Sequence, residues 1–591
     1  MSTLSKCYEA AQRLEQALGC PHVESNLFSY RAASVRDESE RYPDQPLNFL
    51  YESGLQKFYV PVSLGGRLAS GEEMLALHRV IASRDLTVNT TFSTQAWSLS
   101  AWIAGTEAQQ RRIAGRILSG AAPCLGFTEK EHGADLLAGE LRAEKVQDGS
   151  YVLTGEKWAI NRATRGDIVN LVAKTGSDQG PRSLTSFWID KRDLDVSQYY
   201  HLPKLNTLGV RGIDLSGIGF RSARVSADAV LGREGEGLDV ALKSLQVTRT
   251  FCSSFSLAAG DVLLRMATSF VGGRKIYGGS ALAIPLVREQ LAQSYVNLLA
   301  AECGAVTAAR GLHLFPQQFS TWSSVVKIQA PLLVEELAST TASVLGARYL
   351  MRDEFMHGMF QKTMRDHMIV NIFDGSRAVC LDSLRLQLRG LVTSLQQTCV
   401  LNQADLVTLF DWQAPLQPCQ FDRLRLYTRE QDAVMMSLPM LARVIEDLQA
   451  DESLTSVEVM AVQAAARRLL TATRELYQAV LDHMASRPDS ADVRMFSFAQ
   501  QYCNLHSAVS SLGVWYFNRH QLRSGLRGGA WVCALVERLG CAQTDATLLP
   551  INARELLVED LQERVESNSM LALIDFPLAT RGSEQQPIHF E

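Results

Sequence analysis

Hydrophobic periodicity changes twice along the chain, and this pattern limits the possible folds more than any other feature of the sequence. Up to about residue 120, apolar residues recur at three- and four-residue spacings, as in EEMLALHRVIASRDL, and Ser70 stands before this run as a helix N-cap. Short β-like runs such as YVLTG and LTSFWID follow, separated by turn signals such as DGS. Long amphipathic segments then return. The sequence therefore predicts a mainly α fold with a central β domain.

We expect four regions along the chain. An N-terminal helical domain over residues 1–120 precedes a small, barrel-like β domain over residues 121–232. Residues 233–398 hold segments long enough to pack as the antiparallel helices of a four-helix bundle. The two prolines of QAPLQPCQFD indicate a linker, and residues 415–591 are expected to form an additional helical domain.

Composition excludes several classes of protein. The chain has 591 residues, of which 46% are hydrophobic and 20% charged, as in an ordinary globular protein. A net charge of −5 and a C-terminal region without lysine argue against a nucleic-acid partner. The N-terminus has no signal or transit peptide pattern, and we find no transmembrane segment, so we expect a cytoplasmic protein. No grouping of His, Cys and carboxylate residues indicates a metal.

A lone carboxylate, Asp374, follows the apolar stretch in MRDHMIVNIFDGS and precedes a Gly-Ser pair. A carboxylate that enters apolar surroundings must be neutralised, paired or used, because an unpaired charge there costs several kcal/mol. One interpretation is that Asp374 caps a helix or begins a turn, since Asp-Gly is a common turn dipeptide. The other interpretation is that Asp374 is a catalytic group.

Five other segments precede this one in order: LGFTEKEHGAD, TGEKWAINRATRGDIVNLVAKT, LNTLGVRGIDLSGIGF, LQVTRTF and GGRKIYG. We expect the second segment to be a hairpin-like strand pair with Gly155 at the bend. Singly, each segment has an ordinary structural interpretation: Thr128 and Asn161 as strand caps, Trp158 as core and Arg274 as a solvated charge at a helix end. The order of all these segments within a helical–β–helical chain is far more specific than any one segment alone.

In this order the segments resemble the acyl-CoA dehydrogenase superfamily of flavoproteins, over about residues 30–395. LGFTEKEHGAD is similar to the family's TEPxAGSD segment, TGEKWAIN to its GxKxWITN strand, GGRKIYG to its R-x-x-F-G helix end and IFDGS to its catalytic (Y/F)EGT. The resemblance implies an N-terminal helical domain, a central β domain and a C-terminal four-helix bundle. It also implies FAD between the β domain and the bundle, with contacts from a second subunit.

The resemblance assigns roles to individual residues. Asp374 is implied as the base that removes the α-proton of an acyl thioester while the β-hydride passes to flavin N5. Thr248, Arg249 and Gly375 are expected beside the substrate. Arg274 and Tyr277 are expected at the FAD of the adjoining subunit, and Gly346 near its adenine end. The flavin ring itself is expected to contact Leu125, Phe127, Thr128, Trp158, Asn161 and Ser376.

The sequence departs from the family pattern at several positions. The usual base is Glu, and Asp374 is one methylene shorter. Thr248 stands where some members place the glutamate on another helix. The indole of the WITN pattern falls one residue early, at Trp158. Leu386, with Arg385 next to it, matches the arginine that some members use on the CoA adenine, so a carrier-protein thioester stays an alternative to CoA.

The leading hypothesis is an FAD-dependent dehydrogenase that converts an acyl-CoA or acyl-carrier-protein thioester into a trans-2-enoyl thioester. An electron-transfer flavoprotein is the expected acceptor, and a homo-oligomer (dimer or tetramer) the expected assembly. The alternatives are an oxidase resembling acyl-CoA oxidase or nitroalkane oxidase, a DNA-associated member of the superfamily, and an interaction protein without activity. The acidic C-terminal region, without lysine, argues against the DNA-associated member.

Overall fold

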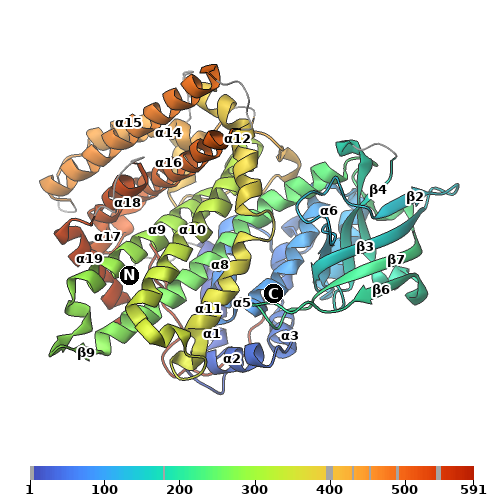
Figure 1. Cartoon of the computed structure of the whole chain (residues 1–591), viewed down its shortest axis with the longest axis horizontal. Helices are drawn as coiled ribbons and strands as arrows, with labels where there is room; N and C mark the ends of the chain where they lie inside the picture. The colour runs from blue at the N-terminus through green and yellow to red at the C-terminus, as the bar shows by residue number, and fades with distance from the viewer. Residues whose placement is uncertain are drawn as a thin grey trace.

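The structure, a computed structural model, describes residues 6–176, 180–394, 403–428, 431–450, 454–486, 492–540 and 548–590. A twisted sheet stands at one end of a large assembly of helices (Figure 1). Helices come first and last in the chain, and the sheet comes between them. This arrangement confirms the predicted fold class, including the additional helices at the C-terminal end. The expected end of the bundle at residue 398 lies outside the described residues.

The N-terminal helices begin at capping residues that the sequence contains. The Ser70 hydroxyl accepts a hydrogen bond from the Glu73 amide at 3.0 Å, which confirms the predicted N-cap of α4. Thr106 and Gln109 form a reciprocal capping box at the start of α7. The helices of this region are α1 (Lys6–Leu18), α2 (Tyr30–Glu38), α3 (Asp44–Glu52), α4 (Gly71–Arg84), α5 (Leu86–Phe92), α6 (Leu99–Ala104) and α7 (Glu107–Leu118).

The central strands form one eight-stranded sheet in the order β6-β7-β3-β2-β4-β5-β8, with β1 paired in parallel to β4. Most of the buried apolar side chains of the sheet form a cluster of their own, whereas Ile168, Trp188 and Leu231 join the core of the helices. The strands are β1 (Pro123–Gly126), β2 (Arg142–Lys145), β3 (Tyr151–Asn161), β4 (Ile168–Lys174), β5 (Leu184–Asp190), β6 (Tyr199–Leu202), β7 (Leu215–Val225) and β8 (Val230–Leu231).

The predicted hairpin bend at Gly155 is wrong. Strand β3 runs straight through this residue and pairs with β2 and β7, whereas β4 pairs with other strands. Gly155 instead sits in an irregularity of the β3–β7 register, with φ at +132°, and a Cβ atom there would lie 2.9 Å from the Cα of Leu141. Glycine is therefore needed for a bulge and a close approach of backbone, which a sequence pattern does not separate from a turn.

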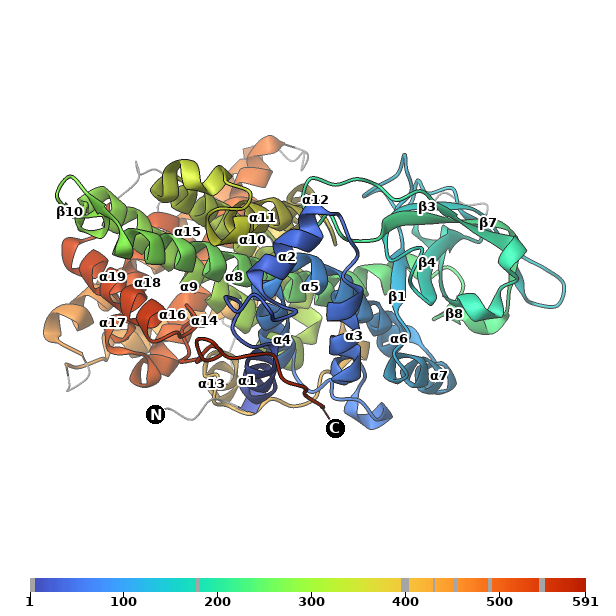
Figure 2. The same ribbon diagram turned by 90° about the horizontal axis from the view of Figure 1, so that it is seen from below.

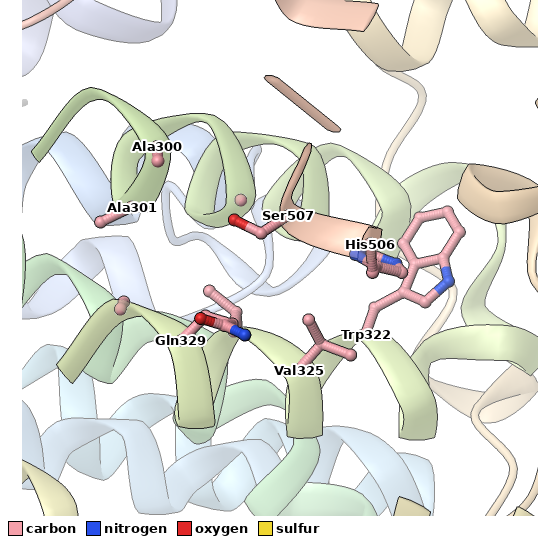
Figure 3. A pocket seen from close by; sticks show the side chains of 10 residues that line it. Ala300, Ala301, Trp322, Val325, Gln329, His506 and Ser507 are labelled. Carbon is pink, nitrogen blue, oxygen red and sulfur yellow. The ribbon is translucent and has the colours of Figure 1, made fainter. Parts of the chain in front are cut away.

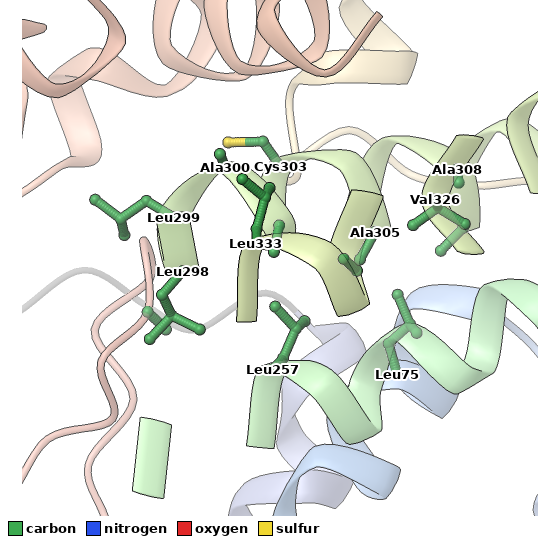
Figure 4. Close-up of a cluster of buried hydrophobic side chains, with 14 of the residues drawn as sticks. Leu75, Leu257, Leu298, Leu299, Ala300, Cys303, Ala305, Ala308, Val326 and Leu333 are labelled. Atoms are coloured by element: carbon green, nitrogen blue, oxygen red, sulfur yellow. The ribbon is translucent and has the colours of Figure 1, made fainter. Parts of the chain in front are cut away.

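Three long helices and two shorter ones form the bundle. Leucines from α4, α8, α9 and α10 face one another in its core, among them Leu75, Leu257, Leu298 and Leu333 (Figure 4). A short hairpin of β9 (Lys275–Ile276) and β10 (Gly279–Ser280) joins the first two long helices. The bundle helices are α8 (Gly237–Gly273), α9 (Pro285–Leu314), α10 (Phe319–Leu345), α11 (Met359–His367) and α12 (Arg377–Ser394).

Among the described residues, one helix, α8, is long and apolar enough by length and composition to cross a membrane. However, 78% of its most apolar window is buried inside the protein. Packing against the other bundle helices therefore accounts for the apolar surface of α8.

A buried ion network joins the first three regions. Lys362 of α11 lies between Asp85, 2.8 Å away at the start of α5, and Asp366, one turn further along α11. Asp366 also accepts a hydrogen bond from the Val210 amide of the β domain at 2.6 Å. The network therefore fixes α11, which leads into the Asp374 turn, against both the N-terminal helices and the sheet.

The additional helices cover the side of the bundle away from the sheet (Figure 1). Helix α16 packs against α9, α10 and α12. The last residues then run back along the N-terminal helices (Figure 2), where the Phe590 amide donates to the Ser53 carbonyl at 2.7 Å. The helices are α13 (Gln403–Phe410), α14 (Ala433–Glu446), α15 (Ser456–Ser486), α16 (Val493–Asn518), α17 (Ser524–Arg527), α18 (Ala530–Gly540) and α19 (Ile551–Glu566).

Candidate active site

Asp374 lies in a tight turn between two helices of the bundle. The turn follows the 3₁₀ helix η12 (Met368–Asn371), and φ is +58° at Asp374 and +102° at Gly375. Ser376 directly precedes α12, and its hydroxyl accepts a hydrogen bond from the Val379 amide at 3.4 Å. The capping function that the sequence allowed for Asp374 therefore belongs to Ser376, whereas the turn that it also allowed is present at Asp374 and Gly375. The turn explains the backbone of Asp374 but not its side-chain contacts.

Arg249 of α8 holds the backbone of this turn. Its Nε donates to the Asp374 carbonyl at 2.7 Å. A Cβ atom at Gly375 would lie 2.6 Å from Nη2 of Arg249, and the positive φ at Gly375 already disfavours any other residue. We expected Arg249 and Gly375 beside the substrate, and the structure packs them against each other under the Asp374 turn.

Two further side chains of α8 contact the Asp374 carboxylate. Cys252 donates its thiol hydrogen to Oδ2 across 3.3 Å. Thr248, one turn earlier, lies close to the carboxylate, and its hydroxyl donates to the Leu245 carbonyl at 3.3 Å. Asp374 is half-buried, and burial raises the pKa of its carboxyl group, while the positive charge of Lys327 and these two side chains limit the rise. A carboxylate with a raised pKa is suited to act as a base.

The end of β1 lies beside β3, which brings two of the predicted segments together. The Thr128 hydroxyl donates to the Trp158 carbonyl at 2.6 Å, and the Trp158 amide donates to the Thr128 carbonyl at 2.9 Å. Strand β3 is irregular between Trp158 and Ile160, where Ala159 has φ at +57°. The early position of the indole in the sequence therefore coincides with a local distortion of the strand.

The same part of the β domain packs on α8. Phe127 and Leu245 share a buried apolar cluster, with Leu125 half-buried against it. Residues three or four apart lie on one face of a helix, so Leu245 shares a face with Thr248. The β-domain segments and the Asp374 turn therefore meet along one face of α8.

Polar atoms at this junction fit the edge of a flavin ring. Asn161 donates through Nδ2 to the Thr90 carbonyl at 3.0 Å. Its Oδ1 and the Thr90 hydroxyl are both buried, and neither has a hydrogen-bond partner in the described part of the chain. A buried polar atom without a partner costs about 1–3 kcal/mol. The edge of an isoalloxazine ring supplies both donors and acceptors, so these residues fit FAD.

Arg274, Tyr277 and Gly346 lie at the other end of the bundle. Arg274 follows the last turn of α8, and its guanidinium and that of Arg348 both lie near the ring of Phe270, at 5.1 and 4.9 Å. Tyr277 is 94% exposed. At 1.5 Å per residue, Arg274 is roughly 37 Å along α8 from Arg249. The structure therefore separates these residues from the Asp374 turn of the same chain.

Leu386 stands at the position where some members of the family have an arginine for the CoA adenine. Leu386 of α12 is 54% exposed, and the neighbouring Arg385 pairs with Asp382 at 2.6 Å. A separate small cavity of about 10 Å³ lies between α9, α10 and α16, lined by Trp322, Gln329 and His506 among others (Figure 3). None of the predicted site residues lines this cavity, so we do not assign it to the active site.

Three residues at the site were not found from the sequence. Cys252 is four residues after Thr248, and this helical spacing was the signal that could have placed it on the same face. Lys327 is a lone charge in the apolar run SSVVKIQAPLLV, which indicates a buried cation but not its partner. His367 bonds Ser256 across 2.9 Å, and no sequence pattern connects these two residues.

Comparisons with families of known proteins match the β domain and the bundle separately. The family described as acyl-CoA dehydrogenase, middle domain, matches residues 124–223. The family described as acyl-CoA dehydrogenase, C-terminal domain, matches residues 235–388. The two matches together span most of the sheet, the Asp374 turn and the larger part of α12.

Individual relatives are distant. The probable acyl-CoA dehydrogenase FadE25 of Mycobacterium tuberculosis is 23% identical over 351 residues, which cover 59% of this chain and 88% of that protein. The structure of butyryl-CoA dehydrogenase from Megasphaera elsdenii has a TM-score of 0.59 at 22% identity, and the match covers 65% of this chain and 98% of that chain.

One structural match includes the additional helices. An acyl-CoA dehydrogenase from Bacillus anthracis, solved in complex with FAD, has a TM-score of 0.69 at 15% identity, and the match covers 95% of each chain. At this identity the likeness is one of fold, and it extends over the whole architecture, including α13 to α19.

Proposed function

Because this chain belongs to the acyl-CoA dehydrogenase superfamily of FAD-dependent oxidoreductases, we propose that it dehydrogenates an acyl thioester between the α and β carbons, with Asp374 as the base. The observation that carries this proposal is the half-buried Asp374 carboxylate, held by Cys252 and close to Thr248 on the helix face that also meets the β-domain segments. Helix α8 thus holds both the main chain of Asp374, through Arg249, and its carboxylate, through Cys252.

Asp374 takes the α-proton of the thioester. An α-proton is only modestly acidic, so the base needs a pKa near the working pH and a fixed position close to the carbon. Burial acts toward the first requirement, because it raises the pKa of the Asp374 carboxyl group. Arg249 provides the second by fixing the Asp374 carbonyl, and Cys252 by fixing one carboxylate oxygen.

FAD, when bound, accepts the two electrons and the hydrogen that leave the β carbon. In our proposal Asn161 and Thr90 hydrogen-bond its ring edge, and Phe127 and Trp158 pack beside the ring. The apolar cluster of Phe127 and Leu245 excludes water from the junction, which strengthens the electrostatic interactions there. Leu125, Thr128 and Ser376 complete the proposed contacts.

A second copy of the chain completes the cofactor site in this proposal. Arg274 cannot contact a ring held beside Asn161 of the same chain, given the roughly 37 Å between Arg249 and Arg274 along α8. An arginine is suited to bidentate contact with a pyrophosphate. We therefore place Arg274 and Tyr277 at the FAD of a partner subunit, with Gly346 near its adenine end. An electron-transfer flavoprotein is the proposed acceptor of the electrons.

Anaerobic titration of the purified protein tests this function. A panel of acyl-CoA and acyl-carrier-protein thioesters is added, and bleaching of the flavin absorption is followed. We expect bleaching by a thioester with a saturated α,β bond and none by a nitroalkane. Slow return of the colour in air supports a dehydrogenase, and rapid return supports an oxidase. A colourless protein, or a yellow one that no thioester bleaches, would contradict the proposal.

A further inference from the structure

A buried lysine of α10 lies directly behind the Asp374 turn. Lys327 is only 2% exposed, and its ammonium group donates to the Val370 carbonyl. The same ammonium lies 4.4 Å from the centroid of the Phe373 ring, as a cation–π contact. A lysine charge is costly to bury, so its position within the bundle calls for an explanation beyond packing.

The two contacts of Lys327 bracket the residues that lead into the turn. Val370 belongs to η12, and Phe373 is the residue directly before Asp374. Phe373 in turn packs against Phe255 of α8, with ring centroids 5.8 Å apart. Lys327 therefore connects the residues that precede Asp374 to α10. On the other side of the turn, Arg249 of α8 holds the Asp374 carbonyl.

The charges around Asp374 are mainly positive. Arg249 faces it from α8 and Lys327 from α10, and their charges both favour the ionised carboxylate. His367 of α11 is buried near Lys327. Burial is the main cause that lowers the pKa of His367 to about 4, and the charge of Lys327 contributes, so His367 is neutral near pH 7. The other polar or titratable groups close to the turn include Thr248, Cys252 and Ser376. Glu335 accepts a hydrogen bond from Asn371, and Arg377 donates to Gln500.

We propose that Lys327 is a positioning residue for Asp374. Its ammonium group fixes Val370 and Phe373, which lead into the turn, and places a buried positive charge next to the half-buried carboxylate. This inference rests on the proposed role of Asp374 as the base. Arg249 bonds the backbone of the turn, so Lys327 is the cation whose main effect on Asp374 is electrostatic. A purely structural lysine would instead affect stability and leave the ionisation of Asp374 unchanged.

Three substitutions separate the charge of Lys327 from its hydrogen bond. Lys327→Gln keeps a donor for the Val370 carbonyl but removes the charge, Lys327→Met removes both, and Lys327→Arg keeps both. Lys57→Met is the matched control, because Lys57 also donates to a backbone carbonyl, that of Phe590 at 2.7 Å, far from the site.

The first readout is the pH dependence of anaerobic flavin bleaching by a thioester. Without the positive charge the pKa of Asp374 rises, so we expect the acid limb of the profile to move up by about one pH unit in Lys327→Gln and Lys327→Met. The limb should stay in place in Lys327→Arg and Lys57→Met. Unchanged limbs in the Gln and Met variants would overturn the proposal.

A second readout does not depend on catalysis. Infrared difference spectra over a pH series contain a carboxyl band for Asp374, identified as the band that Asp374→Asn removes. We expect its titration midpoint to rise in Lys327→Gln relative to the unsubstituted protein. If no thioester bleaches the protein, the proposed function fails but this midpoint still tests Lys327. Equal midpoints in the two proteins would overturn the inference by themselves.

Discussion

At the scale of single residues, the site depends on two neighbours with opposite requirements. The proposed function requires a charged side chain at Asp374. Gly375 must have no side chain, because Arg249 occupies the space where a Cβ atom would be. The sequence pattern found both residues, since FDGS is a local motif. It missed Lys327 and Cys252, because their relation to Asp374 exists only after α8 and α10 pack around the turn.

Substitution of Gly375 tests this close packing. Gly375→Ala puts a methyl group 2.6 Å from Nη2 of Arg249 on a backbone with φ at +102°, so the guanidinium or the turn must move. We expect the bleaching rate with a thioester to fall about a hundredfold, since a shift of about 1 Å has this effect on positioned groups. Gly149→Ala is the control, with φ at +84° and open space around its Cβ. Similar rates for both variants would show that the contact is unimportant.

The thiol of Cys252 is expected to affect the pH profile. Its hydrogen bond to Asp374 favours the charged form, so its removal in Cys252→Ala raises the pKa of the carboxyl group further. The base is active only when it is ionised. As the pH is lowered, we therefore expect this variant to lose activity at a higher pH than the unsubstituted protein. Cys252→Ser keeps a donor and should retain the original acid limb. The measurement is the bleaching rate against pH, and coincident limbs for Ala and Ser would contradict the assignment.

At the scale of elements, α8 and α11 do most to position the Asp374 turn relative to the β domain. Helix α8 meets the β domain through Leu245 and the Asp374 turn through Thr248 and Cys252. Helical periodicity predicted such helices, because an apolar face is a property of the local sequence. The course of β3 through Gly155 could not be predicted in the same way, since a bulge and a turn both use glycine and differ only in strand pairing.

The buried network at α11 is expected to carry stability. Lys362→Met leaves Asp85 and Asp366 without their shared cation in the protein interior. Removal of one member of a buried ion pair typically costs about 3–5 kcal/mol. We therefore expect a clear fall in the thermal unfolding midpoint of this variant. Arg111→Ala, which breaks an exposed pair with Glu107, is the control and should change the midpoint little. Equal midpoints would show that the network is not a stabilising contact.

At the scale of the whole molecule, the two ends of the bundle have different roles. The Asp374 end meets the sheet of the same chain, whereas the Arg274 end is exposed and distant from it. The family pattern in the sequence indicated both ends, but only the length of α8 shows that they lie far apart in one chain, roughly 37 Å between Arg249 and Arg274. The additional helices were expected from the hydrophobic periodicity. The packing of α16 against α9, α10 and α12 could not be predicted from the sequence.

Mixed oligomers test whether two chains share a cofactor site. Asp374→Asn loses the base but keeps Arg274, and Arg274→Glu loses the arginine but keeps Asp374. If each site combines Asp374 of one chain with Arg274 of the other, co-expression of the two variants restores one intact site in a mixed dimer. We expect bleaching by a thioester in the co-expressed protein and little in either variant alone. Activity no higher than that of the separate variants would contradict a shared site.

The most direct measurement of the central claim compares Asp374→Asn with the unsubstituted protein in the anaerobic thioester titration. Asparagine is nearly isosteric with aspartate but cannot accept a proton at working pH. The variant is predicted to keep its yellow flavin spectrum and to lose bleaching by every thioester that bleaches the unsubstituted protein. Bleaching at the same rate in both proteins would remove Asp374 from the chemistry.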